Sequence, residues 1–73
     1  MTIYDVSDET RAAAKAAQDE LVAACKTYVC AREAAARTED GTTPEAAEAK
    51  VRLYRAASIA YEIDQQAARE ARR

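Results

Sequence analysis

The sequence contains no histidine, tryptophan or phenylalanine, and it has one glycine and one proline among its 73 residues. Without histidine, the chain lacks the side chain that most often exchanges protons near neutral pH and most often binds metals. A single glycine also excludes a glycine-rich phosphate loop. A zinc site would need the two cysteines of each of two chains. We therefore expect no enzyme active site, no cofactor and no metal.

The sequence also lacks long apolar runs and a strong charge imbalance. Its 11 basic and 13 acidic residues give a net charge of −2, which argues against non-specific attraction to nucleic acid or to an anionic membrane. No uncharged stretch approaches the roughly 20 apolar residues of a membrane span. The first ten residues are acidic and do not resemble a signal peptide. The expected location is the cytoplasm.

The only glycine and the only proline lie three residues apart, between two alanine-rich halves of the chain. Alanine is the best helix former, Gly41 fits a left-handed helix stop, and Pro44 fits the first position of a following helix. A turn this short forces the two helices to be antiparallel neighbours. The prediction is a single all-α domain over residues 1–73, an alanine-rich two-helix hairpin. Its expected parts are a helix over about residues 8–38, a turn over residues 39–43 and a helix over about residues 44–71, with Ser7 and Thr43 as N-caps.

A heptad pattern predicts which sides of the two helices face each other. In each helix, alanine or a larger apolar residue recurs at alternating spacings of three and four. Antiparallel pairing of the two seams gives residue numbers that sum to 80 or 81 in every layer, and leucine or isoleucine meets alanine in two layers, which suits close packing. The predicted seam consists of Ala14, Ala17, Leu21, Ala24, Tyr28, Ala31 and Ala35 in the first helix and Ala46, Ala49, Leu53, Ala56, Ala60, Ile63 and Ala67 in the second.

Large apolar side chains are few, because much of the hydrophobic fraction is alanine. Alanine contributes little burial energy, and a chain of this length buries a smaller share of its surface than larger domains do. We therefore expect the hairpin to depend on an additional surface, supplied by a partner or by a second copy.

Beside the seam, each helix carries a second apolar stripe on the same rotational flank. In an antiparallel pair these two stripes fall on the same side of the hairpin. They form one face that a single chain leaves in water, and such a patch usually marks an interface. We call it the apolar face; it consists of Val22, Cys25 and Val29 in the first helix and Tyr54, Ala57 and Tyr61 in the second.

Three occupants of the apolar face are open at this point. A second copy would give a homodimeric four-helix bundle, a foreign protein could dock there, or the N-terminal residues Ile3, Tyr4 and Val6 could fold over it. The homodimer is favoured, and it is compatible with binding to a further protein target.

The two cysteines lie five residues apart, which places Cys25 and Cys30 about 140° apart around a helix. An internal disulfide is excluded by this geometry. Cys25 is expected to be a small buried apolar residue, and Cys30 to lie opposite the seam, exposed or against a partner. A reactive thiol at Cys30, one turn after Lys26, stays open as an alternative.

The function that these features favour is a small helical protein–protein interaction module. Short length and richness in alanine, arginine and threonine favour a bacterial or bacteriophage accessory protein. Such a protein would bind and modulate, or inhibit, a larger host protein, acting in the host-cell cytoplasm if phage-encoded. A structural subunit of a larger assembly is the alternative. A nucleic-acid-associated regulator is a second alternative, weakened because Arg55 points away from Tyr54 and Tyr61.

Overall fold

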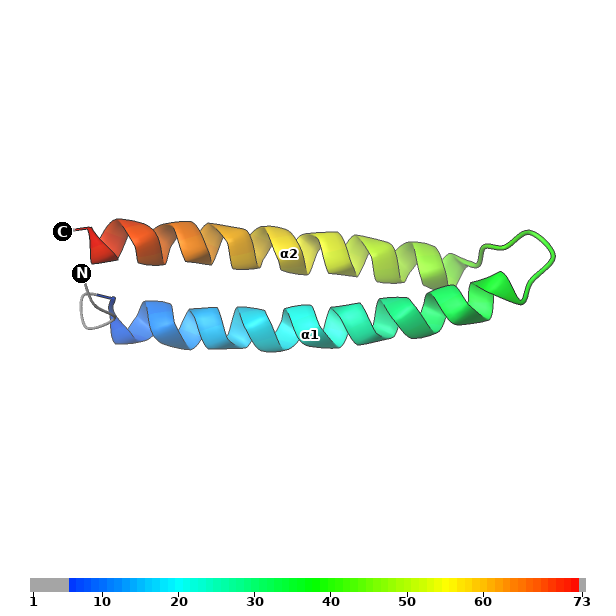
Figure 1. Ribbon diagram of the computed structural model, residues 1–73, viewed down its shortest axis with the longest axis horizontal. Helices are drawn as coiled ribbons and strands as arrows, with labels where there is room; N and C mark the ends of the chain where they lie inside the picture. Colours follow the sequence, from blue (N-terminus) through cyan, green and yellow to red (C-terminus); the bar gives the residue numbers. More distant parts are fainter. Residues whose placement is uncertain (1–5, 73) are drawn as a thin grey trace.

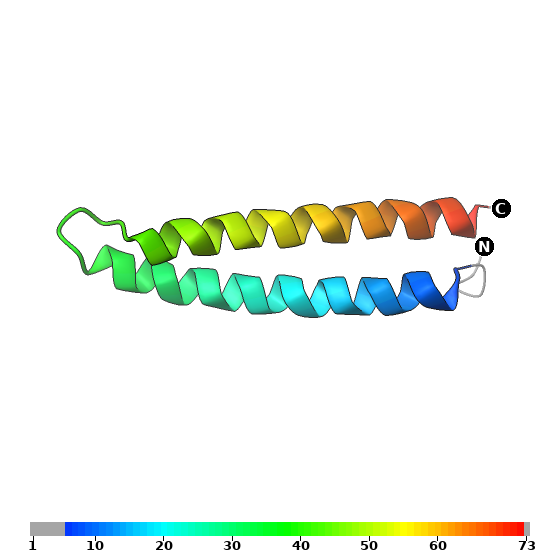
Figure 2. The same cartoon turned by 180° about the vertical axis from the view of Figure 1, so that it is seen from behind.

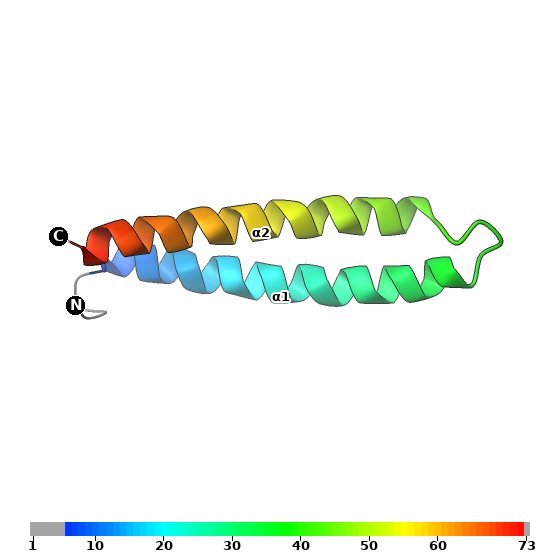
Figure 3. The same ribbon diagram turned by 45° about the horizontal axis from the view of Figure 1, so that its top comes forward.

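The computed structural model describes residues 6–72 and consists of two antiparallel helices (Figure 1). α1 spans Asp8–Ala36 and α2 spans Pro44–Ala71. The helices lie side by side from the turn to the opposite end, both from behind (Figure 2) and in a view turned by 45° (Figure 3). The predicted all-α hairpin is thus confirmed. Ile3 and Tyr4, considered above as a cover for the apolar face, lie outside the described residues.

Both helices begin at the predicted capping residues. The side-chain oxygen of Ser7 accepts the N–H of Thr10 at 3.1 Å, and that of Thr43 accepts the N–H of Ala46 at 3.1 Å. Pro44 opens α2, where its missing N–H leaves no helical hydrogen bond unmade. Local side-chain chemistry therefore sets both starting points.

α1 ends two residues before the predicted end of the first helix. The Thr38 hydroxyl donates to the carbonyl of Ala35 at 2.7 Å, and the Thr38 N–H donates to the same carbonyl at 3.0 Å. These bonds replace helical ones and turn the chain. Gly41 follows with a φ of 71°, the left-handed conformation that glycine adopts without steric cost. The connection therefore comprises residues 37–43.

The burial pattern confirms the predicted seam. Every seam position is buried or half-buried. Its most deeply buried members are alanines, and Ala24 and Ala35 have no exposed surface. No large side chain in the described part of the chain is fully buried, and the large seam residues that stay half-exposed are Leu21, Tyr28, Leu53 and Ile63. Two helices alone bury the alanines of the seam most deeply, but they leave its larger side chains partly exposed to water.

The molecule is a thin rod, measuring 54 × 16 × 14 Å along its principal axes. Its radius of gyration is 16.2 Å, whereas a compact domain of this length would have about 11 Å. In a rod one helix pair thick, every residue outside the seam lies close to water. Side faces are therefore the largest surfaces the protein can offer to a partner.

A polar layer extends the seam at the end opposite the turn. Thr10 and Glu70 occupy the next seam positions, and both are buried, with 9% and 8% of their surface exposed. Glu70 Oε2 accepts from Thr10 Oγ1 at 2.5 Å and from Gln66 Nε2 at 2.8 Å, while Oε1 accepts the N–H of Ser7 at 2.8 Å. The start of α1 is thereby tied to the end of α2. The apolar pattern missed this layer, although the numbers 10 and 70 sum to 80 as in the seam.

Acid is expected to weaken this polar layer. Hydrogen bonds from Thr10, Ser7 and Gln66 lower the pKa of Glu70 from 4.5 to about 2. Because the pKa is lower in the folded chain, ionised Glu70 stabilises the fold above about pH 4.5, and this contribution is lost as the pH falls towards 2. Melting temperatures from circular dichroism should fall across that range, and less steeply for Glu70→Gln. Equal slopes for both proteins would contradict the assignment.

Candidate protein interface on the side of the hairpin

All residues of the apolar face are exposed in the single chain. Cys25, expected to be buried, is instead exposed, because its flank position beside the seam receives no cover from α2. Cys30 is exposed, as predicted. The exposed fractions of the large residues are 42% for Val22, 54% for Val29, 62% for Tyr54 and 65% for Tyr61, and Ala57 is exposed as well.

In the predicted seam register, which the Thr10–Glu70 hydrogen bond shares, the apolar face forms three rows across the two helices. A row pairs residues whose numbers sum to 82 or 83, close to the 80 or 81 of the seam. The face covers eight residues of each helix, a rise of about 10 Å along the axis, in the middle of the rod. The rows are Val29 with Tyr54, Cys25 with Ala57, and Val22 with Tyr61.

The surface of the apolar face is ridged and open. On α2 the two tyrosines and Ala57 line one shallow depression. On α1 Cys25 and Val29 line another, which extends outward to Lys26 and Cys30. Each stripe thus has its own depression on its own helix. Small molecules bind in concave pockets that bury most of their surface. These shallow, open depressions therefore suit the side of another helix better than a small ligand.

Charged residues border the apolar face at both ends. Arg32 and Lys50, one on each helix, line a depression towards the turn, and Lys50 Nζ lies 5.6 Å from the centre of the Tyr54 ring. Gln18 and Asp64 occupy the corresponding row towards the termini. Within residues 6–72, neither Arg32, Lys50 nor Asp64 forms a salt bridge. The face therefore has a cationic border at one end and an anionic residue at the other.

The opposite flank of the seam is closed by polar contacts between the helices. Arg52 Nε and Nη2 donate to the two carboxylate oxygens of Glu20 at 2.9 and 2.8 Å, and Nη1 donates to Thr27 Oγ1 at 3.2 Å. These hydrogen bonds, with the opposite charge, lower the pKa of Glu20 and raise that of Arg52. Polar side chains thus bridge the helices on this flank, although Ile59, seven residues after Arg52, is 47% exposed there. No such bridge crosses the flank with the apolar face among the described residues.

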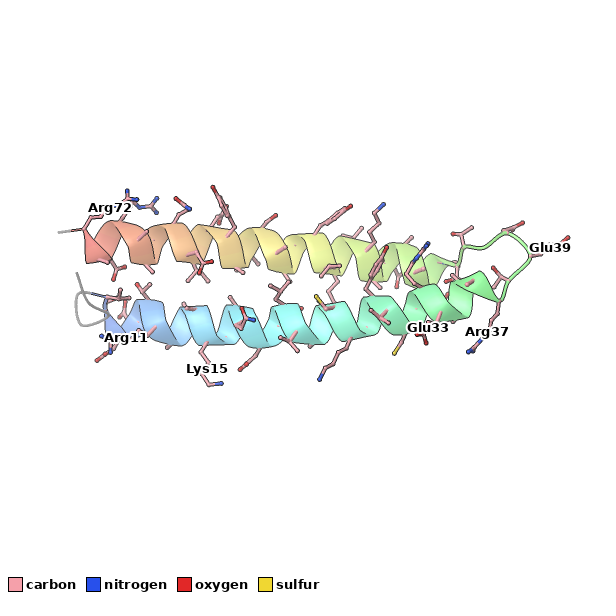
Figure 4. All side chains as sticks on the ribbon, in the orientation of Figure 1. Arg11, Lys15, Glu33, Arg37, Glu39 and Arg72 are labelled. Atoms are coloured by element: carbon pink, nitrogen blue, oxygen red, sulfur yellow. The ribbon has the colours of Figure 1, made fainter. Side chains whose placement is uncertain are left out.

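Charged side chains occupy the outside of the rod. Lys15 projects from α1 away from α2, and Glu39 lies at the tip of the turn (Figure 4). Among residues 6–72, no three acidic or cysteine side chains converge as metal ligands. No helix in the described chain has the length and apolar character needed to cross a bilayer.

Comparison with known proteins finds no relative: no family model, no curated protein and no solved structure matches the chain. Function is accordingly inferred from the surface of the chain itself.

Proposed function

We propose that the protein is a small protein–protein interaction module that self-associates through its apolar face. The observation that carries this proposal is the exposure of two valines and two tyrosines at the centre of one side of the rod. Large apolar side chains gathered in water mark interfaces, and their burial is favourable in proportion to the area covered. Tyrosine suits such a surface because it combines an apolar ring with a polar tip.

A second hairpin is the favoured occupant because the seam beneath the face is incomplete. Leu21 and Tyr28 of α1 and Leu53 of α2, at seam positions that adjoin the apolar face, are only half-buried. A four-helix bundle would cover these side chains together with the apolar face, since all helices then share one core. The dimer would serve as an accessory protein whose charged outer surface binds and modulates a larger protein.

Two valines provide a matched test of the interface. Val29, on the apolar face, and Val51, on the outer side of α2, are each 54% exposed. Glutamate at position 29 would have to be buried without a partner in the dimer, so Val29→Glu should raise the dissociation constant at least about tenfold, or ~1.4 kcal/mol. Val51→Glu adds the same charge where water remains and should leave it unchanged. Light scattering over a concentration series measures both, and equal effects would contradict the proposal.

The larger target can be identified by affinity capture from the native cell, followed by mass spectrometry. Recovery of one protein with the dimer supports an accessory role. Co-purification with a large particle would instead support a structural subunit, and recovery of nucleic acid would overturn the proposal.

A further inference from the structure

The apolar face is symmetric about the row that contains Cys25 and Ala57. On α1, its two valines lie three residues before and four residues after Cys25. On α2, its two tyrosines lie three residues before and four residues after Ala57. Each of the two flanking rows therefore holds one valine and one tyrosine, so a two-fold axis through the central row would place valine against valine and tyrosine against tyrosine.

The charges at the two ends of the apolar face differ in sign. Seven residues from the central row towards the turn lie Arg32 and Lys50, and seven residues towards the termini lie Gln18 and Asp64. One end thus carries two cations and the other a single anion. If a second copy is turned end to end, the cationic end of each copy lies opposite the anionic end of the other.

We infer that the occupant of the apolar face is a second copy of this chain, stacked antiparallel with its turn at the opposite end. The two-fold axis runs between the copies, perpendicular to the long axis of the rods. It passes over both helices of each copy at the level of Cys25 and Ala57. This inference rests on the proposed function and specifies its partner and register. α1 lies on the copy's α1, so that Val29 meets the second copy's Val22. α2 lies on the copy's α2, where Tyr61 meets the second copy's Tyr54.

Charge complementarity selects this orientation. The two-fold axis brings Asp64 opposite the second copy's Lys50, and it does so twice in the dimer. Within one chain these residues are about 21 Å apart along α2, and neither forms a salt bridge among the described residues. If both turns lay at the same end, Lys50 would instead face the second copy's Arg32, and such like-charge contacts oppose binding.

The side of the rod that carries the apolar face is large enough for a stable dimer. It measures 54 Å by 16 Å, or roughly 860 Å², close to the ~800 Å² that each partner contributes to a standard interface, so the dimer needs contacts along the whole rod as well as at the apolar face. The short apolar centre supplies desolvated contacts, and the charged ends fix the direction of the copy.

The two cysteines report on the proposed arrangement. The axis places Cys25 beside the second copy's Cys25. Cys30 lies five residues further along α1 and about 140° around it, so the two copies of Cys30 are on distant outer surfaces. Cys30→Ser leaves only Cys25, and Cys25→Ser leaves only Cys30. Both thiols are exposed in the single chain, which makes the variants a matched pair.

Treatment of these variants with a short bismaleimide tests the axis. The Cys30→Ser protein should form a covalent dimer at least about tenfold faster than the Cys25→Ser protein, and this difference should vanish in urea. Equal rates in buffer, or faster crosslinking through Cys30, would overturn the arrangement.

Charge reversal tests the direction of the copy. Lys50→Asp and Asp64→Lys should each raise the dissociation constant at least about fivefold at low salt, because each creates two like-charge contacts. The double variant should return to within about twofold of the native value, since the pairs are restored with exchanged signs. If the double variant stays as weak as the single ones while the native chain is dimeric, the antiparallel register is wrong and the interaction module stands. A monomeric native chain would overturn both.

Discussion

Replacing Ala24 by aspartate is expected to abolish cooperative folding of the hairpin. Ala24 has no exposed surface and lies on the seam in the middle of α1. The aspartate side chain is too short to carry its carboxylate past α2 into water. Burial of an unpaired carboxylate costs several kcal/mol, which is comparable to the total of roughly 4–11 kcal/mol that a chain of 73 residues usually has.

The neighbouring residue supplies the control for this substitution. Ala23 is exposed, so Ala23→Asp adds the same charge and the same loss of helix propensity without burial. It should lower the free energy of unfolding by only about 0.7 kcal/mol. Urea unfolding followed by circular dichroism at one protein concentration compares the two variants. Similar losses for both would show that the seam does not pass through Ala24.

The double substitution Tyr54→Glu and Tyr61→Glu is expected to dissociate the dimer completely. The two rings are 62% and 65% exposed in the single chain and would be central anchors of the interface, where removal of one aromatic anchor costs about 2 kcal/mol or more. The dissociation constant should therefore rise at least about a thousandfold. Light scattering measures the change as a fall in mass to that of one chain.

The matched control places two glutamates on the outer side of the same helix. Val51 and Gln65 are both exposed and lie away from the apolar face. The double substitution Val51→Glu and Gln65→Glu should leave the mass at that of the native assembly. A native mass for the tyrosine variant would exclude the apolar face as the interface.

The hairpin is predictable from the sequence because its determinants are local or periodic. Ser7 and Thr43 cap the helices through residues three positions further on, and Gly41 takes the backbone conformation that glycine favours. α1 ends two residues before the predicted end of the first helix, because the Thr38 hydroxyl competes for a helical carbonyl. Hydrophobic periodicity does not contain this effect. Heptad spacing then predicts the seam without knowledge of any contact.

The sequence pattern does not predict the contacts between polar residues of the two helices. Glu70 is buried against Thr10, and Arg52 spans the helices to Glu20, because the seam register brings together side chains far apart in the sequence. The composition of the apolar face follows from heptad spacing alone. Its occupant does not, since periodicity identifies an uncovered side of a helix but carries no information on what covers it. For the same reason, periodicity does not show that Cys25 is exposed in the single chain.

The mass of the native protein in solution tests the central claim most directly. Sedimentation equilibrium over a concentration series should give about 16 kDa, twice the 8.0 kDa of one chain, with dissociation only on dilution. The melting temperature should rise with concentration, because association stabilises the folded chain. A mass of 8.0 kDa at every concentration, with a cooperative melting transition that does not depend on concentration, would contradict the account.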